Sequence, residues 1–189
     1  MKRRDFLRSA MLASAAAAYG CASRREDHES PPREPRLSRG EFPEAAVRYF
    51  VEEKKSCAES LVLAGCRMLG AEEDLLPAAA LGLGGGIGLR GKPCACLTGG
   101  AMVLSLAAFM KEKDYAARKK LLYKVVGGFV ERFEKELGAT DCRALCGLDL
   151  TTREGMTLFQ EKKKAEVCGP IMRKAALLVV EAMKDIAPA

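Results

Sequence analysis

Histidine is almost absent from this sequence. Among its 189 residues His28 is the only one, and it lies in a charged stretch with several prolines, where we interpret it as a solvated residue and not a ligand. The remainder of the chain can therefore build neither a Ser-His-Asp triad nor a catalytic zinc site with histidine ligands. This absence excludes histidine-dependent hydrolytic enzymes.

Two cysteine motifs are also missing. The chain has no C-x-x-C-H segment, which excludes covalent attachment of a c-type haem. It has no C-x-x-C pair of the kind found in common thiol oxidoreductases, and no alternation of strands and helices that would indicate a thioredoxin-like fold. Any cysteine chemistry must therefore use a different arrangement of thiols.

The glycine-rich segment 82–91 does not form a nucleotide site. Residues 86–91 match G-x-G-x-x-G in letters, but an alanine-rich helical segment precedes them and Pro93 follows, in place of the required strand and helix. We interpret the glycines as allowing tight backbone turns beside a cysteine site, with a simple mobile loop as the alternative.

Excess charge does not indicate nucleic-acid binding. The formal net charge is +6, and residues 1–21 supply half of it through four basic residues and one acidic residue. The basic runs at 118–120 and 162–164 are interleaved with acids on helical patterns, so we interpret them as solvated helix faces. Residues 93–110 are uncharged, but their glycines, Ser105 and cysteines favour a central buried helix over a membrane span.

The amino-terminal 21 residues resemble a twin-arginine export signal. Arg3 and Arg4 are followed by an uncharged, alanine-rich stretch up to Gly20 and Cys21. The last residues loosely resemble a lipobox, which makes Cys21 a lipidation candidate and a membrane tether; ordinary signal cleavage nearby is the alternative. We expect an exported protein that is periplasmic or anchored to the membrane by lipid.

The rest of the chain predicts a linker and one all-α domain. Residues 22–40 are charged and proline-bearing and predict a disordered linker. Residues 41–189 have the size of one compact helical bundle, with helices predicted near 42–50, from 57 to Gly70, over 93–110, over 114–137, over 142–145, and from 169 onward. The helix over 114–137 is amphipathic, and the residues expected on its buried stripe are Leu122, Val126, Phe129, Phe133 and Leu137.

Four cysteines stand where helices are predicted to begin. Ser56 and Glu59 form a capping-box pattern around Cys57, and Pro93 precedes Cys94 at a position suited to a first helical turn. Cys142 follows two good capping residues, Thr140 and Asp141. Cys168 precedes Gly169 and Pro170, which place a proline at a helix entry. Helix N-termini favour thiolate over thiol, and the thiolate is the form that binds metal or attacks a disulfide.

The order of these motifs resembles the C_GCAxxG_C_C family of redox-active bacterial proteins. The residues that carry the resemblance are the segment 56–59, the glycine-rich run before Cys94, Thr98-Gly99, and the segment 147–149 after Cys142. One departure is Ala95-Cys96, where the family usually has Gly-Ala. Because split-Soret cytochromes show a related domain, the resemblance implies an iron–sulfur cluster, of the [2Fe–2S] type, ligated by Cys57, Cys94, Cys142 and Cys168.

Three other cysteines leave alternatives open. Cys66 reads as a small buried hydrophobic residue, whereas Cys96 and Cys146 are additional redox candidates. A thiol–disulfide oxidoreductase with Cys94 as the nucleophile and Cys96, Cys142 or Cys146 as the resolving cysteine is the rival hypothesis. Structural disulfides or a closed zinc site would give a non-redox protein. We favour electron transfer or redox sensing with a redox partner protein that the sequence does not identify.

Overall fold

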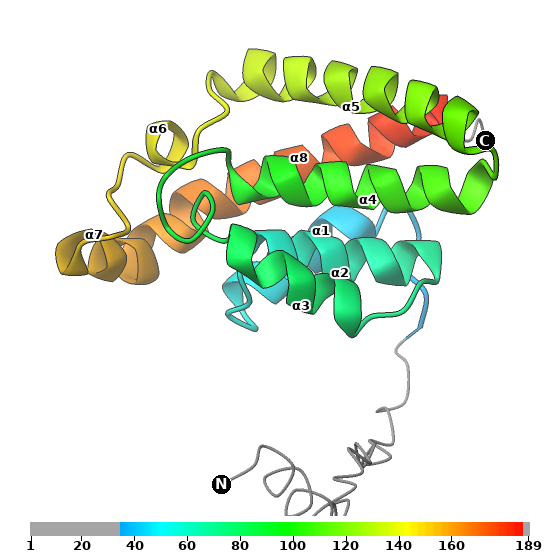
Figure 1. Ribbon diagram of the computed structural model, residues 1–189. Coiled ribbons are helices and arrows are strands. Elements are labelled where there is room, and N and C mark those ends of the chain that lie inside the picture. The colour runs from blue at the N-terminus through cyan, green and yellow to red at the C-terminus, as the bar shows by residue number, and fades with distance from the viewer. Residues whose placement is uncertain (1–34, 187–189) are drawn as a thin grey trace, which may run out of the picture. The chain divides into compact units, whose positions relative to one another are not determined.

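The computed structural model describes residues 35–186, and all regular elements in this range are helical. The predicted all-α fold is thus confirmed, while the predicted signal peptide, Cys21 and linker residues 22–34 lie outside the described residues. The principal helices, drawn in Figure 1, are α1 (Phe42–Val51), α2 (Cys57–Leu69), α3 (Leu75–Ala80), α4 (Ala95–Lys111), α5 (Tyr115–Leu137), α6 (Cys142–Cys146), α7 (Arg153–Leu158) and α8 (Gly169–Ala182).

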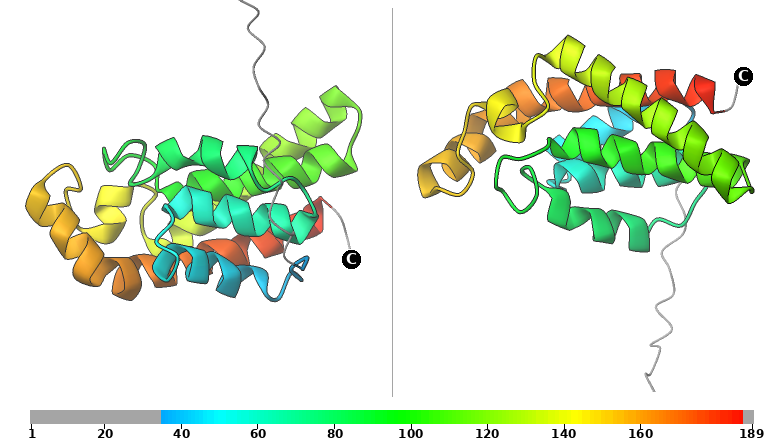
Figure 2. Two further views of the ribbon diagram at one scale, coloured as in Figure 1. Left: turned by 90° about the horizontal axis from the view of Figure 1, so that it is seen from below. Right: turned by 45° about the horizontal axis from the view of Figure 1, so that its top comes forward.

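Helices α2 and α4 form the centre of the bundle and run parallel. A side chain on Gly65 of α2 would meet Val103 of α4, and one on Gly99 of α4 would meet the backbone of Ala58. Residue numbers therefore increase in the same direction along both helices, so α2 and α4 begin at the same end of the bundle. Figures 1 and 2 show α1 and α8 packed on one side and α5 lying across α4 and α8.

The helix boundaries follow the local signals in the sequence. The Ser56 hydroxyl accepts from the Glu59 N–H at 3.3 Å, and the Glu59 carboxylate accepts from the Ser56 N–H at 3.1 Å, which completes the predicted capping box. Gly70 and Gly138 end α2 and α5 with φ values of 72° and 83°. Both glycines occupy the left-handed conformation that commonly stops a helix.

The uncharged segment predicted as a buried helix is α4. Its buried residues include Cys96, Val103 and Leu104, which lie among α2, α5 and α8. Within residues 35–186 no helix combines the length and the apolar character needed to cross a membrane.

The buried stripe of α5 is narrower than the sequence indicated. Phe129 and Phe133 are buried as predicted, and Val125 joins them, whereas Leu122, Val126 and Leu137 are only half-buried. The reason is that α5 lies at the outside of the bundle and packs mainly against α4 and α8. The amphipathic pattern thus located the helix but overestimated the width of its contact.

A helical stretch that the sequence did not predict precedes α8. Helix α7 continues into a π-helix, η2 (Phe159–Cys168), which leads directly into α8. A π-helix has wider turns than an α-helix, and Pro170, just beyond the end of η2, explains them. Pro170 has no N–H to donate, and its ring would clash with the carbonyl of residue 166 in a regular α-helix. Within this junction the Gly169 N–H instead donates to the Lys164 carbonyl, five residues back.

The close approach of α2 and α4 predicts opposite effects for two glycine-to-alanine substitutions. A Cβ on Gly65 would lie 2.4 Å from Cγ2 of Val103, so Gly65→Ala should lower the free energy of unfolding by about 1–3 kcal/mol. A Cβ on Gly127 of α5 would meet nothing within 4 Å, so Gly127→Ala should raise it by roughly 0.5–1 kcal/mol. Urea unfolding of both variants checks this, and equal effects would contradict the packing described.

Candidate functional site

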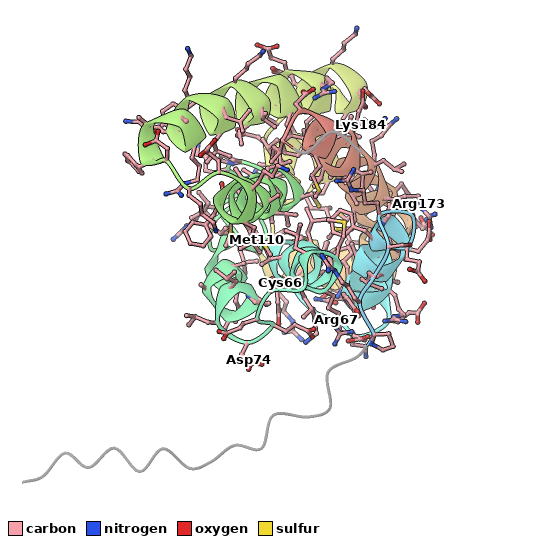
Figure 3. The ribbon with its side chains drawn as sticks, turned by 90° about the vertical axis from the view of Figure 1, so that its right-hand side faces the viewer. Cys66, Arg67, Asp74, Met110, Arg173 and Lys184 are labelled. Atoms are coloured by element: carbon pink, nitrogen blue, oxygen red, sulfur yellow. The ribbon has the colours of Figure 1, made fainter. Side chains whose placement is uncertain are left out.

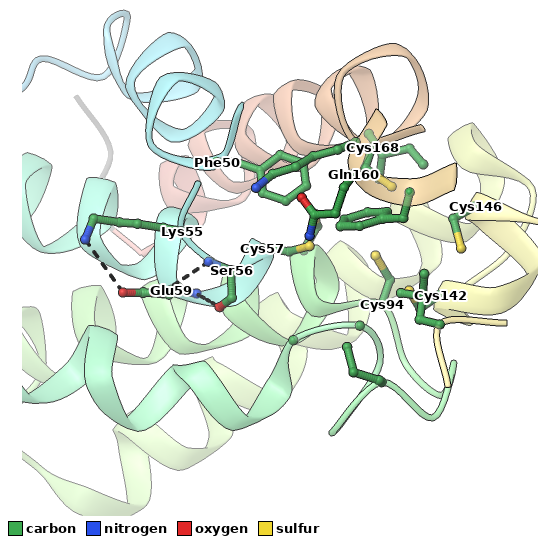
Figure 4. A pocket seen from close by; sticks show the side chains of 18 of the residues that line it. Phe50, Lys55, Ser56, Cys57, Glu59, Cys94, Cys142, Cys146, Gln160 and Cys168 are labelled. Carbon is green, nitrogen blue, oxygen red and sulfur yellow. Dashed lines mark hydrogen bonds and ion pairs between the residues drawn. The ribbon is translucent and has the colours of Figure 1, made fainter. Parts of the chain in front are cut away.

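Six cysteine side chains line one cavity at the end of the bundle where α2 and α4 begin. The cavity has a volume of about 280 Å³, and Figure 4 shows five labelled cysteines, four of them predicted ligands, around it. Its cysteines are Cys57, Cys94, Cys96, Cys142, Cys146 and Cys168. The structure therefore brings together all four predicted ligands and both additional redox candidates. Cys66 is fully buried elsewhere on α2, as predicted.

Two of these cysteines occupy the N-termini of the central helices α2 and α4. Cys57 is the first residue of α2, inside the capping box, and Cys94 is the N-cap residue of α4. Pro93 is not part of the predicted first turn, because it lies before the N-cap and pairs with Asp141 in an isolated antiparallel bridge. The positive ends of two central helices thus point toward the cavity.

Backbone hydrogen bonds across this bridge fix Cys94 next to Cys142. The Cys94 N–H donates to the Thr140 carbonyl at 2.7 Å, and the Cys142 N–H donates to the Lys92 carbonyl at 2.9 Å. Cys142 opens the short helix α6, with Asp141 at the N-cap position but without a hydrogen bond from its side chain. Both cysteine backbones are therefore held by partners from the opposite segment.

The glycine-rich loop wraps around the Cys142 backbone in a left-handed turn. Residues 85–89 all have positive φ, including Ile87 at 56° and Leu89 at 67°, which is unusual for side chains of this kind. A Cβ on Gly86 would lie 2.8 Å from Cβ of Cys142 and 2.5 Å from the Lys92 carbonyl oxygen. This agrees with the interpretation of tight turns beside a cysteine site. Backbone strain of this type concentrates at functional sites.

Cys168 is the N-cap residue of α8, as predicted, but the expected free helix end is absent because the preceding π-helix continues into α8. It is the last residue of η2, and the helical backbone continues through Gly169 and Pro170 into α8. The Gly-Pro pair that resembled a helix entry marks the change from π-helix to α-helix inside one continuous stretch. Cys168 reaches the cavity from the side of this helix and receives no stabilisation from a helix end.

Hydrogen bonds among the thiols separate the acidities of Cys94 and Cys96. The pKa of Cys94 is lowered, first by a hydrogen bond from the Cys96 thiol and then by backbone N–H groups of Cys96 and Leu97, although burial acts in the opposite direction. The pKa of Cys96 is raised well above its usual range because its thiol bonds to Cys57 and Cys94 and is buried. Of these two thiols Cys94 therefore loses its proton first, and Cys96 keeps its proton to higher pH.

The remaining shifts come from burial and mutual repulsion. Burial raises the pKa of Cys142 and of Cys168, and the negative charges of neighbouring cysteines raise both further. Burial also raises the pKa of Cys66 to about 11. Without a cation these cavity thiols therefore resist ionising together, and a positively charged group bound among them would be favoured.

Lys164 is a functional candidate that the sequence analysis missed. Its side chain is 7% exposed and lines the cavity, with Nζ lying 4.8 Å from the centroid of the Phe50 ring. Burial lowers its pKa, while negative charge at Cys57 and Cys168 acts in the opposite direction. The run 162–164 was interpreted as a solvated face, but the wide π-helical turn directs the third lysine inward; no local sequence signal indicated this.

The arrangement supplies sulfur ligands without histidine. In the described part of the chain all seven cysteines are free thiols, and no three His, Cys, Asp or Glu side chains are grouped closely enough for a single metal ion. Apolar side chains, among them Leu150, Met156, Phe159 and Ile171, form much of the remaining wall. A group larger than one ion, or a set of exchanging thiols, suits such a cavity.

Comparison with known proteins identifies the class. Residues 55–182 match the family model described as "Putative redox-active protein (C_GCAxxG_C_C)", and the chain belongs to this family. The matched range contains every cysteine of the cavity and excludes the amino-terminal segment. No curated protein and no solved structure matches the chain.

The thiol hydrogen bonds predict the pH dependence of alkylation. In reduced, metal-free protein the thiolate of Cys94 should form at lower pH than an ordinary cysteine thiolate, because its pKa is lowered. Cys96→Ala removes the largest cause of this shift and should move the pH profile of Cys94 alkylation upward. Mass spectrometry after iodoacetamide treatment measures the profile, with Cys66→Ala as the control. An unchanged profile in Cys96→Ala would refute the assignment of donor and acceptor.

Proposed function

We propose that Cys57, Cys94, Cys142 and Cys168 bind an iron–sulfur cluster, of the [2Fe–2S] type, that serves electron transfer or redox sensing. The observation that carries this proposal is the convergence of these four cysteines, from four separate elements, on one cavity. When bound, such a cluster would accept and release single electrons. The protein would hold the cluster by thiolates, exclude water with the apolar wall, and balance its charge.

The cavity fits a cluster better than a single zinc ion. Four sulfurs around one tetrahedral Zn²⁺ lie roughly 3.8 Å apart, because each Zn–S bond is about 2.3 Å long. The described cysteines do not form such a group, and the cavity that they line together with other residues has a volume of about 280 Å³. The helix N-termini at Cys57 and Cys94 and the ammonium group of Lys164 would stabilise the negative charge of a thiolate-ligated cluster.

Thiol–disulfide exchange is the second candidate function, and the lowered pKa of Cys94 favours it. In this reaction the Cys94 thiolate would attack a disulfide of the substrate and form a mixed disulfide while one substrate thiolate leaves. Cys96 or Cys142 would then displace the second substrate thiol and close a disulfide with Cys94, so that the substrate gains two electrons. Such an enzyme needs neither iron nor the thiols of Cys57 and Cys168.

The proposed site of action is outside the cytoplasm. This rests on the resemblance of residues 1–21 to a twin-arginine signal, a pathway that exports folded proteins and so suits a cofactor inserted beforehand. We further propose that lipidation of Cys21 tethers the chain to the membrane and that a redox protein is its partner. Secretion of a reporter fused to residues 1–21, with and without Arg3→Lys/Arg4→Lys, tests the export signal.

The cluster hypothesis predicts colour, iron and sulfide in protein purified without oxygen. Visible charge-transfer absorption should accompany stoichiometric iron and acid-labile sulfide, and Cys→Ser at any one of the four proposed ligands should remove most of all three signals. Cys66→Ser is the matched control, because Cys66 is buried outside the cavity and should leave the spectrum intact. Colourless protein without metal would exclude a cluster and leave thiol exchange, which Cys57→Ser should then tolerate.

Lys164 predicts a shift in the reduction potential of the same centre. Its positive charge beside Cys57 and Cys168 should favour the reduced, more negative state, so Lys164→Met should lower the potential by an amount on the order of tens of millivolts. A redox titration followed by visible absorption measures the shift. Lys162→Met is the control, since Lys162 lies exposed on the same element. Equal potentials in both variants would show that the Lys164 charge does not act on the centre.

A further inference from the structure

The helical hairpin formed by the end of α4 and the start of α5 exposes aromatic and apolar side chains. Four of the ten exposed large hydrophobic side chains in the described part of the chain lie here: Phe109, Met110, Tyr115 and Tyr123. Tyr115 and Tyr123 are 67% and 69% exposed. An exposed apolar patch of this kind marks an interaction site.

This hairpin is also strongly basic. Residues 109–124 contain six lysines and arginines and only two acidic residues, whereas residues 125–137 of the same helix contain two basic and three acidic residues. Both acids of the hairpin bond to backbone N–H groups: Glu112 accepts from the Asp114 N–H, and Asp114 accepts from the Ala117 N–H. The excess positive charge is therefore confined to the tip and its first turns.

Cationic side chains of the hairpin lie against its aromatic rings. The guanidinium of Arg118 lies 5.1 Å from the centroid of Phe109 and 5.8 Å from that of Tyr115. Lys113 and Lys119 lie at similar distances from Phe109 and Tyr123. Aromatic rings with flanking Lys and Arg are typical of protein surfaces that rest in the headgroup layer of a bilayer.

The described chain enters the domain at the same end. Arg36 donates to the carbonyls of Met68 and Leu69 in the last turn of α2, and because α2 and α4 run parallel, this turn lies near the end of α4. Figure 3 views this end, with Cys66 and Arg67 of α2 and Met110 of α4 labelled. In the left view of Figure 2 the α4–α5 hairpin extends beyond the neighbouring helices.

We propose that the α4–α5 hairpin, residues 109–124, is a docking surface for an anionic lipid bilayer. The lysines and arginines would contact lipid phosphates, and Phe109, Met110 and Tyr115 would enter the headgroup region. A protruding, convex surface suits a bilayer better than a protein groove. The contact is limited to the hairpin, because the α2–α3 loop at this end carries Glu72 and Asp74 in addition to Glu73, which pairs with Arg67.

Docking in this way would direct the cysteine cavity away from the bilayer. Helix α4 begins at Cys94 in the cavity wall and ends at the hairpin, so the two sites lie at opposite ends of one helix. The proposal depends neither on lipidation of Cys21 nor on the identity of the redox centre.

Cosedimentation with vesicles tests the proposal on a chain of residues 22–189, which retains every described contact but carries no lipid. Wild-type protein should bind vesicles of 3:1 phosphatidylcholine and phosphatidylglycerol, and bind pure phosphatidylcholine at least about tenfold more weakly. Lys119→Glu/Lys120→Glu should weaken binding to the anionic vesicles about tenfold or more, as should raised salt. Phe109→Ser/Tyr115→Ser should weaken it several-fold without a change in charge.

The matched control is Arg153→Glu/Lys162→Glu, which makes the same change in net charge at exposed positions near the cavity end. It should keep at least half of the wild-type binding. Failure of the wild type to bind anionic vesicles, or an equal loss in the control, would overturn the proposal. Binding to polyglutamate but not to the vesicles would also overturn it, in favour of an acidic protein partner. All substituted residues are exposed, and the unfolding midpoint of each variant verifies that it folds.

Discussion

The close, parallel packing of α2 against α4 is the constraint on which the rest of the structure depends. It is possible because Gly65 and Gly99 carry no side chains where the two helices meet Val103 and Ala58. Parallel helices place their N-termini at the same end, so Cys57 and Cys94 are brought to one site by the geometry of the core itself. The position of the cysteine cavity is therefore a consequence of core packing, and a disturbance of that packing would reach the cysteines.

The other two family cysteines arrive by less regular routes. Cys142 is held through backbone hydrogen bonds to the segment 91–92, and Cys168 by a π-helix that widens the turn before Pro170. Both routes use unfavourable backbone states: the left-handed turn at 85–89 and a helix with poorer hydrogen-bond geometry. These unfavourable backbone conformations lie in the elements that border the cavity, while the central helices keep regular geometry.

Local signals explain what could be predicted from the sequence and what could not. The capping box at Cys57, the glycine stops of α2 and α5, and the buried α4 depend on neighbouring residues, and the sequence predicted each of them. The prediction of a free helix end at Cys168 was wrong because a Gly-Pro pair suits both a helix entry and an interruption within a helix. Only tertiary contacts decide between the two. The interpretation of Lys164 as part of a solvated face was wrong for the same reason, since the inward direction of its side chain follows from the π-helical turn.

Charge within the cavity links these features to function. Burial disfavours the charged form of Cys142 and Cys168, and neighbouring thiolates repel it further, which is why the pKa values of both rise. The cavity offers three compensations: two helix N-termini, the proton of Cys96 shared with Cys57 and Cys94, and the ammonium group of Lys164. With these compensations the pKa of Cys94 is lowered, whereas the pKa values of Cys96, Cys142 and Cys168 remain raised. A site with four thiolates therefore requires bound positive charge, and iron within a cluster would supply it at the one place where the fold gathers the cysteines.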